Sequence, residues 1–367
     1  MFKKKAIGIS LIAAALAGLI ALAGCSSNQD SQTESDAGEE QARYTIDIGH
    51  LNSTAHVLAF VAQEEGFFDE EGIDATLTQF DSSAELVSGL ESDKLDVALI
   101  GSVPTLVNIS SGHDLTVFGG AMTNGHGIVI DSKYTEGLDD WDITILEGKN
   151  VAVPINTVQQ LETYEALADA GLTYGEDDSY DVQITLFESQ KDAYNALSSD
   201  EIDAVTTYSP YTSIAVADGY SVVYNCADLE RFKNQPCCRQ VATTSAIDSD
   251  PEKFEAFERA MIKAYEFYKS DKEQTIADVK KYIDIPEDEI EYELYTEGYC
   301  DSNPDPDYQA TESLKADALD FGYIETDFDL SEHYDLTIYE NALNSLIEED
   351  PSNTTLASLQ EHFEEYQ

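Results

Sequence analysis

Two adjacent cysteines and an arginine, Cys237, Cys238 and Arg239 in the stretch NQPCCRQ, are the residues whose types and spacing most readily suggest chemistry. A structural zinc site uses two separated pairs of cysteine or histidine, and a thiol redox centre uses C-x-x-C. The chain has neither pattern, so we predict no metal site and no cofactor. A guanidinium can grip an oxyanion through two parallel hydrogen bonds, or it can pair with a protein carboxylate. Both roles remain open for Arg239.

The N-terminal segment indicates the compartment in which these thiols lie. Three lysines precede a long apolar run, which is typical of an export signal and predicts a signal peptide over residues 1–24. An uncleaved membrane anchor is the alternative. The ending LAGC favours the signal, because it resembles the lipobox of bacterial lipoproteins, in which the cysteine, here Cys25, is acylated and becomes the mature N-terminus. Residues 25–43 are polar and acidic, so we expect a lipidated, disordered tether. The predicted location is extracytoplasmic, with a lipid anchor in the membrane.

Thiols outside the cytoplasm tend to oxidise. If Cys25 is acylated, four cysteines remain, and they allow three fully paired connectivities among which the sequence does not choose. We expect one or two structural disulfides, or partly free thiols, among Cys226, Cys237, Cys238 and Cys300.

The charge of the chain excludes two classes of partner. It has 19 basic and 73 acidic residues, which give a net charge of −54. Nucleic-acid binding and adsorption to anionic lipid both need clustered Lys and Arg, so we expect neither. Contact with the membrane is expected only through the lipid anchor, and the acidity itself favours solubility.

Alternating strand-like and helix-like segments must position any site. Strand-like segments are separated by segments with helical apolar spacing, and the pattern starts afresh after residue 149, which indicates βαβ units with mainly parallel sheets. The chain from Pro251 onward is mostly helical, with residues 251–270 the clearest amphipathic helix. We predict an α/β fold in three parts: a first lobe over residues 44–125, a second lobe over 126–240, and a return to the first lobe with C-terminal helices over 241–367.

Long stretches of both lobes resemble one family of transport proteins. The first is AQEEGFFDEEGIDATLTQFDSSAELVSGLESDKLDVALIGSVPTLVNISSGHDLTVFGG, and the second lobe adds GKNVAVPINTVQQLETYEALADAGL and DAYNALSSDEIDAVTTYSPY. These stretches are similar to the nitrate/sulfonate/taurine-type solute-binding proteins of ABC importers, a related branch of which binds thiamine precursors. The resemblance covers residues 44–270 well and the helical C-terminus loosely. It implies a two-lobed, type II periplasmic-binding-protein fold that closes on a small molecule.

The loops that follow the predicted strands are where we expect that molecule, because open α/β sheets bind ligands beyond the carboxyl ends of their strands. Helix N-termini there offer unpaired N–H groups and the positive end of the helix dipole, which favour anions. One such loop carries Asp81, but no Asp or Glu occurs in the other five: HLNSTAH, IGSVP, MTNGHG, PINTVQQ and TYSPY. The sequence therefore predicts a site for an anion, or for the anionic end of a zwitterion.

The candidate ligand-binding residues are polar or aromatic side chains in these loops, together with the arginine that the resemblance places near the cleft: Asn52, Ser53, Thr54, His56, Ser102, Thr123, Asn124, Asn156, Thr157, Tyr208 and Arg239. Each has a structural alternative, since Ser, Thr and Asn also cap helices and Tyr208 can pack in the core. We expect structural or solvated roles for His50, His113 and His126, which show no metal-ligand spacing.

The resemblance implies that the protein captures a small organic anion, of the sulfonate or taurine kind or else nitrate or bicarbonate, and delivers it to an ABC permease and its ATPase. A thiamine-precursor pyrimidine is the alternative ligand. An enzyme on the same fold is a further alternative, because pyrimidine-forming enzymes of thiamine synthesis are relatives. Those enzymes work in the cytosol, and no local sequence pattern suggests an activated nucleophile. We therefore expect a binding protein without catalytic residues.

Overall fold

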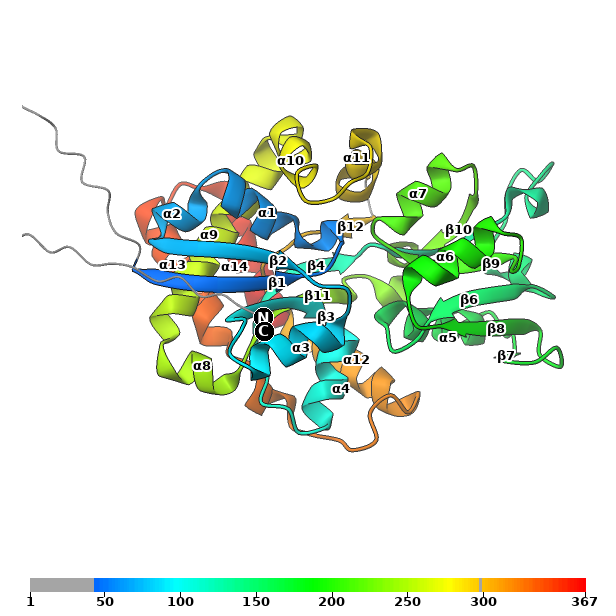
Figure 1. Ribbon diagram of the computed structural model, residues 1–367, viewed down its shortest axis with the longest axis horizontal. Coiled ribbons are helices and arrows are strands. Elements are labelled where there is room, and N and C mark those ends of the chain that lie inside the picture. Colours follow the sequence, from blue (N-terminus) through cyan, green and yellow to red (C-terminus); the bar gives the residue numbers. More distant parts are fainter. Residues whose placement is uncertain (1–42, 297–298) are drawn as a thin grey trace, which may run out of the picture. The chain divides into compact units, whose positions relative to one another are not determined.

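The structure is a computed structural model that describes residues 43–296 and 299–367 (Figure 1). The predicted signal peptide, Cys25 and nearly all of the predicted tether lie outside the described residues. The folded body begins where the sequence predicts, because β1 starts at Tyr44. No helix in the described ranges is both long enough and apolar enough to cross a bilayer.

The first sheet has the strand order β12-β4-β11-β3-β1-β2. Its strands are β1 (Tyr44–His50), β2 (Ile73–Gln79), β3 (Val97–Gly101), β4 (Thr116–Asn124), β11 (Pro236–Ala242) and β12 (Cys300–Asp301). Strands β1, β2 and β3 are parallel, whereas β11 runs antiparallel to both β3 and β4. The sheet is mixed rather than wholly parallel.

Strand β3 shows why this sheet forms. Its residues Val97–Ile100 are completely buried, as expected for a central strand covered on both faces. Because side chains alternate along a strand, Val97 and Leu99 join the core beneath α1 (Val57–Glu64) and α9 (Pro251–Ser270), while Ala98 and Ile100 join the core beneath α3 (Ser83–Glu91).

The second sheet has the order β10-β5-β9-β6-β8-β7. Its strands are β5 (His126–Ile130), β6 (Asn150–Pro154), β7 (Tyr174–Gly175), β8 (Val182–Phe187), β9 (Ala204–Tyr208) and β10 (Ser221–Asn225). Figure 1 shows the two sheets side by side, each with its own helices. Helix α5 (Val158–Asp169) lies over one face of the second sheet, and α6 (Gln190–Ser198) and α7 (Tyr211–Ala217) over the other.

The remaining helices belong mainly to the C-terminal part of the chain, as the sequence predicts. They are α2 (Phe67–Glu70), α4 (Ser102–Ser110), α8 (Thr244–Ser249), α10 (Lys272–Val279), α11 (Glu287–Tyr295), α12 (Tyr308–Asp320), α13 (Leu336–Glu349) and α14 (Thr354–Tyr366). Helix α13 packs against α9 and α14, so these helices complete the core of the first sheet.

The chain crosses between the sheets twice. The first crossing is at Gly125, where φ is +79°, a left-handed backbone conformation that favours glycine. The second crossing ends at Pro236, because β11 pairs with β3 and β4. From the sequence we expected the second lobe to extend to residue 240. Arg239 and Gln240 interrupt the apolar pattern of β11, so this fully buried strand of the first sheet was not predicted.

Candidate ligand-binding site

The two lobes touch through the loops that the sequence singled out. Ser53 Oγ donates a hydrogen bond of 2.9 Å to the carbonyl oxygen of Ser209, and the hydroxyls of Thr54 and Ser209 also hydrogen bond to each other. Ser53 and Thr54 follow β1 of the first sheet, while Ser209 follows β9 of the second. This structure therefore brings together the carboxyl ends of strands from both sheets.

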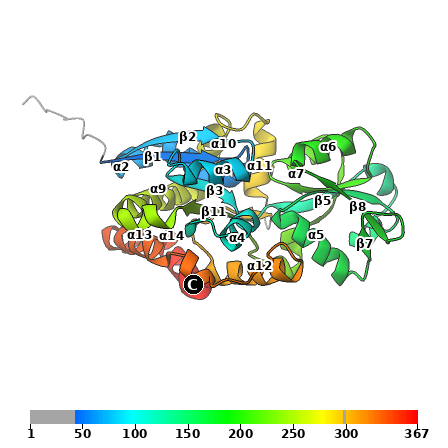
Figure 2. The same cartoon turned by 60° about the horizontal axis from the view of Figure 1, so that its bottom comes forward.

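An apolar contact joins the lobes beside these hydroxyls. Val158 and Leu161 of α5 share one buried cluster with Val103 and Leu106 of α4 and with residues of α12. Figure 2 shows α4, α5 and α12 next to one another. Because α5 covers the second sheet and α4 follows a strand of the first, this cluster buries side chains of both lobes and holds them together.

Ser53 and Thr157 cap the helices that face this region. The Ser53 hydroxyl accepts a hydrogen bond from the backbone N–H of Ala55, and the Thr157 hydroxyl accepts one from the N–H of Gln160. Asn156, just before Thr157, is exposed and has φ of +56°. Its backbone N–H donates to the Gln160 side chain. Ser53 and Thr157 therefore have the capping role that the sequence offered beside ligand contact, whereas the Asn156 side chain caps no helix.

Four residues discussed in the sequence analysis carry buried polar atoms with no hydrogen-bond partner among the described residues. The atoms are both ring nitrogens of His56, the hydroxyl of Ser102, Nε2 of His126 and Nε of Arg239. Burial, together with nearby His50, lowers the pKa of His56 to about 3, so its imidazole is neutral at physiological pH. Buried polar groups are normally hydrogen bonded. A polar molecule bound between the lobes would supply such partners.

Four other predicted residues are either exposed or have partners within the protein. Asn52 is exposed, and the Thr123 hydroxyl donates to the carbonyl oxygen of Asp301 over 3.3 Å. The Asn124 side chain donates to the carbonyl oxygen of Phe232 over 2.6 Å, which holds the return segment against the first crossing. Tyr208 packs edge-on against Tyr211, and burial raises its pKa.

Arg239 forms a buried ion pair. Its side chain is 1% exposed, and Nη2 lies 3.0 Å from Oδ2 of Asp307, whose side chain is completely buried. Nη1 donates to the carbonyl oxygen of Cys238 over 2.9 Å. The sequence had left open an anion-binding role and an ion pair, and the structure shows the ion pair. Nη1 and Nη2 are thus paired, Nε has no hydrogen-bond partner among the described residues, and the guanidinium lies out of contact with solvent.

A chain of charged side chains extends from this ion pair to the C-terminal helix. His362 of α14 donates from Nε2 to Asp307 Oδ1 over 2.7 Å. Burial would lower the pKa of His362, but the Asp307 carboxylate outweighs burial and raises it. Burial and the nearby Asp307 charge also raise the pKa of Asp305 to about 7.

We predict that the free energy of unfolding falls as the pH rises from about 4 to 7. A group whose pKa is raised by folding stabilises the protein fully below its unfolded pKa, and this contribution is lost as the pH rises through the folded pKa. For Asp305 the loss spans roughly pH 4 to 7, from an unfolded pKa of about 3.9. Urea unfolding at pH 5 and 7.5 measures the difference, which Asp305→Asn should reduce. The exposed Asp74→Asn serves as control, and an unchanged difference in Asp305→Asn would contradict the assignment.

Cys226, Cys237, Cys238 and Cys300 are all free thiols in the structure, whereas the sequence led us to expect one or two disulfides or partly free thiols. Cys237 Sγ and Cys238 Sγ lie 3.2 Å apart in a small cluster that includes Met122. The mutual hydrogen bond and burial raise the pKa of Cys237, and burial with the nearby Glu162 charge raises that of Cys226. Thiols in such surroundings are poor nucleophiles.

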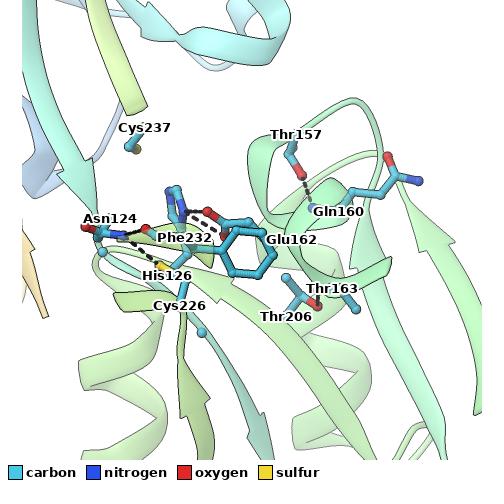
Figure 3. A network of polar contacts seen from close by, with 12 residues as sticks. Asn124, His126, Thr157, Gln160, Glu162, Thr163, Thr206, Cys226, Phe232 and Cys237 are labelled. Carbon is cyan, nitrogen blue, oxygen red and sulfur yellow. Dashed lines mark hydrogen bonds and ion pairs between the residues drawn. The ribbon is translucent and has the colours of Figure 1, made fainter. Parts of the chain in front are cut away.

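Sequence reasoning missed a second polar cluster, shown in Figure 3. His126 Nδ1 lies 3.0 and 3.1 Å from the two carboxylate oxygens of Glu162, and Cys226 Sγ completes the group. His126 begins β5, Glu162 lies on α5, and Cys226 follows β10, so no local spacing could reveal them. Glu162 also corrects the idea that the region is free of acid, because the helix brings in a carboxylate that the loops lack.

Known proteins share this architecture. Residues 38–283 match the NMT1-like family. The chain belongs to that family. The nitrate-binding protein of Synechocystis PCC 6803 is similar in structure, with a TM-score of 0.70 and 15% identity over 82% of this chain and 89% of that chain. None of the curated proteins compared with the chain matches it.

Two sulfonate-binding proteins are also similar to this member of the NMT1-like family. The alkanesulfonate-binding protein of Xanthomonas axonopodis pv. citri, bound to MOPS, has a TM-score of 0.65 and 15% identity over 80% of this chain and 98% of that chain. The periplasmic aliphatic sulphonate-binding protein of Escherichia coli has a TM-score of 0.64 and 17% identity over 79% and 97%. At these identities the likeness establishes the fold, which is the predicted periplasmic-binding-protein fold.

Proposed function

We propose that the protein is the extracytoplasmic substrate-binding lipoprotein of an ABC importer. It captures a small organic anion between its lobes and delivers it to a permease driven by an ATPase. The observation that carries this proposal is that polar atoms of His56 and Ser102 in the first lobe and of His126 in the second are buried without a hydrogen-bond partner among the described residues. Family membership and the fold shared with nitrate- and sulfonate-binding proteins support it.

Helix N-termini favour an anion at this place. Ser102 is the first residue of α4, and Thr157 caps α5, so the positive ends of two helix dipoles and their unpaired N–H groups lie at the facing edges of the lobes. Neutral hydrogen-bond donors of this kind bind sulfonate, carboxylate, nitrate or bicarbonate. A thiamine-precursor pyrimidine, the alternative ligand, would use the same polar atoms without needing the dipoles.

A binding role agrees better with the site than catalysis. The thiols of Cys226 and Cys237 are buried and have raised pKa values, so neither is an activated nucleophile. Thermal-shift screening combined with chromatography of the added compound distinguishes the two functions. We expect a compound that stabilises the protein and is recovered unchanged, whereas its conversion to a product would favour an enzyme.

Replacing Cys25 by serine should release the protein from the membrane. The lipid is attached to the thiol of Cys25, so the variant cannot be acylated. Without the lipid, the very acidic chain has no affinity for anionic lipid headgroups. Fractionation of cells expressing wild type or Cys25→Ser, with a salt wash of the membranes, measures this. We expect wild type in the membrane pellet and the variant in the soluble fraction. A variant that stays in the washed pellet would refute lipid anchoring.

A further inference from the structure

We propose that His126, Glu162 and Cys226 form a binding site for a zinc-class divalent cation at the base of the ligand site. Each residue offers one ligand atom, and these atoms all lie within 4.8 Å of one another. The three residues are 1%, 2% and 0% exposed. They come from three separate segments of the second lobe, around its crossings to the first.

The chemistry of the three donors selects the class of metal. Imidazole nitrogen, carboxylate oxygen and thiolate sulfur together are ligands of zinc and its transition-metal neighbours, whereas magnesium and calcium prefer oxygen alone. Zinc bonds of about 2.0–2.3 Å in a tetrahedron place the donor atoms about 3.3–3.6 Å apart. His126 Nδ1 is already 3.0 Å from Glu162 Oε2, so small side-chain movements suffice to form the site.

Neighbouring groups hold the donors in place. The side-chain amide of Asn124 lies 3.5 Å from Cys226 Sγ and is itself fixed by the carbonyl oxygen of Phe232. Such outer hydrogen bonds orient metal ligands and tune their affinity. Figure 3 shows Asn124, His126, Glu162 and Cys226 gathered in this way, with Cys237 of the first sheet above them.

If the protein captures an anion as proposed, the cation would offset the negative charge of Glu162 beside the ligand. A buried carboxylate repels an anionic ligand, and Arg239 does not offset it because it pairs with Asp307. When a divalent cation binds, the Cys226 thiol releases its proton to solvent. The cation is then neutralised by Glu162 and the Cys226 thiolate, and three protein ligands leave its fourth position open. That position would accept an oxygen of the bound anion.

Zinc uptake tests the site without any organic ligand. Protein stripped with a chelator is incubated with equimolar zinc, desalted and analysed for metal by mass spectrometry, and cobalt is added in parallel to detect a thiolate charge-transfer band. We expect about one zinc per wild-type chain and a loss of affinity of at least tenfold in Cys226→Ser and Glu162→Gln. The controls are Cys300→Ser, which removes a partly buried thiol outside the proposed site, and the double variant Cys237→Ser/Cys238→Ser, and both should bind zinc as wild type does. Circular dichroism checks that each variant is folded.

Two results would contradict the proposed zinc site: no zinc uptake by wild type, or uptake lost in Cys237→Ser/Cys238→Ser and kept in Cys226→Ser.

Calorimetric titration with ethanesulfonate then compares zinc-loaded and stripped protein. Tighter binding to the loaded form supports the open position, and equal binding to both forms refutes that role while leaving the proposed transport function intact. Binding to neither form, in a protein that takes up zinc, would count against sulfonate capture and against the open position.

Discussion

Replacing Arg239 by methionine is expected to destabilise the folded protein by about 3–5 kcal/mol, because removing one partner of a buried ion pair leaves an uncompensated buried charge. The charge left behind would be that of Asp307, whose side chain is completely buried. His362 also contacts Asp307 and would offset part of the loss. Urea unfolding of wild type and variant at the same pH measures the change.

The exposed pair of Arg43 and Glu252 provides the control, since its side chains are 67% and 66% exposed. Arg43→Met should change the free energy of unfolding by at most about 1 kcal/mol. The double variant Arg239→Met/Asp307→Asn should lose less than the sum of the two single variants, because it leaves no unpaired charge. If Arg239→Met unfolded like wild type and bound the ligand more weakly, the arginine would be a ligand-binding residue after all.

The double substitution Ser53→Ala/Thr54→Val is expected to weaken ligand binding by roughly 5- to 150-fold. It removes two hydrogen bonds between the lobes, each worth about 0.5–1.5 kcal/mol. Ligands that bind between two lobes favour the closed arrangement, so contacts made only on closure add to the measured affinity. Calorimetric titration with the ligand identified for the wild type measures this loss.

A buried hydroxyl pair inside one lobe provides the matched control. Thr163 and Thr206 hydrogen bond over 2.8 Å, both within the second lobe. Thr163→Val should lower the melting temperature without changing the affinity by more than about twofold. Equal affinity of Ser53→Ala/Thr54→Val and wild type would mean that these hydroxyls do not contribute to closure on the ligand.

The fold could be predicted from the sequence because its signals are local. The apolar run of β3 and the helical spacing of α9 each indicate their element within a few residues. Ser53 and Thr157 cap helices where their residue types favour capping. Strand β11 was missed because Arg239 and Gln240 interrupt its apolar pattern, and the partner that Arg239 finds, Asp307, is distant in the sequence.

The site could be predicted only in part, because its contacts join distant segments. The loops after the strands were found from their position, yet the bond from Ser53 to Ser209 spans 156 residues. Glu162 and Cys226 come together with His126 only once the second sheet and α5 have formed. Histidine, carboxylate and thiol spaced this far apart carry no local signal, and for that reason His126 was expected to have a structural or solvated role.

Native mass spectrometry of the protein purified without denaturation, followed by calorimetric titration with the molecule found, tests the central claim most directly. We predict one small organic anion per chain, and a ligand at 100 times its dissociation constant should add about 2.7 kcal/mol to the free energy of unfolding. The titration should be repeated with ethanesulfonate, taurine, nitrate, bicarbonate and an aminopyrimidine. A protein that carries no small molecule and is stabilised by none of these compounds would contradict the account.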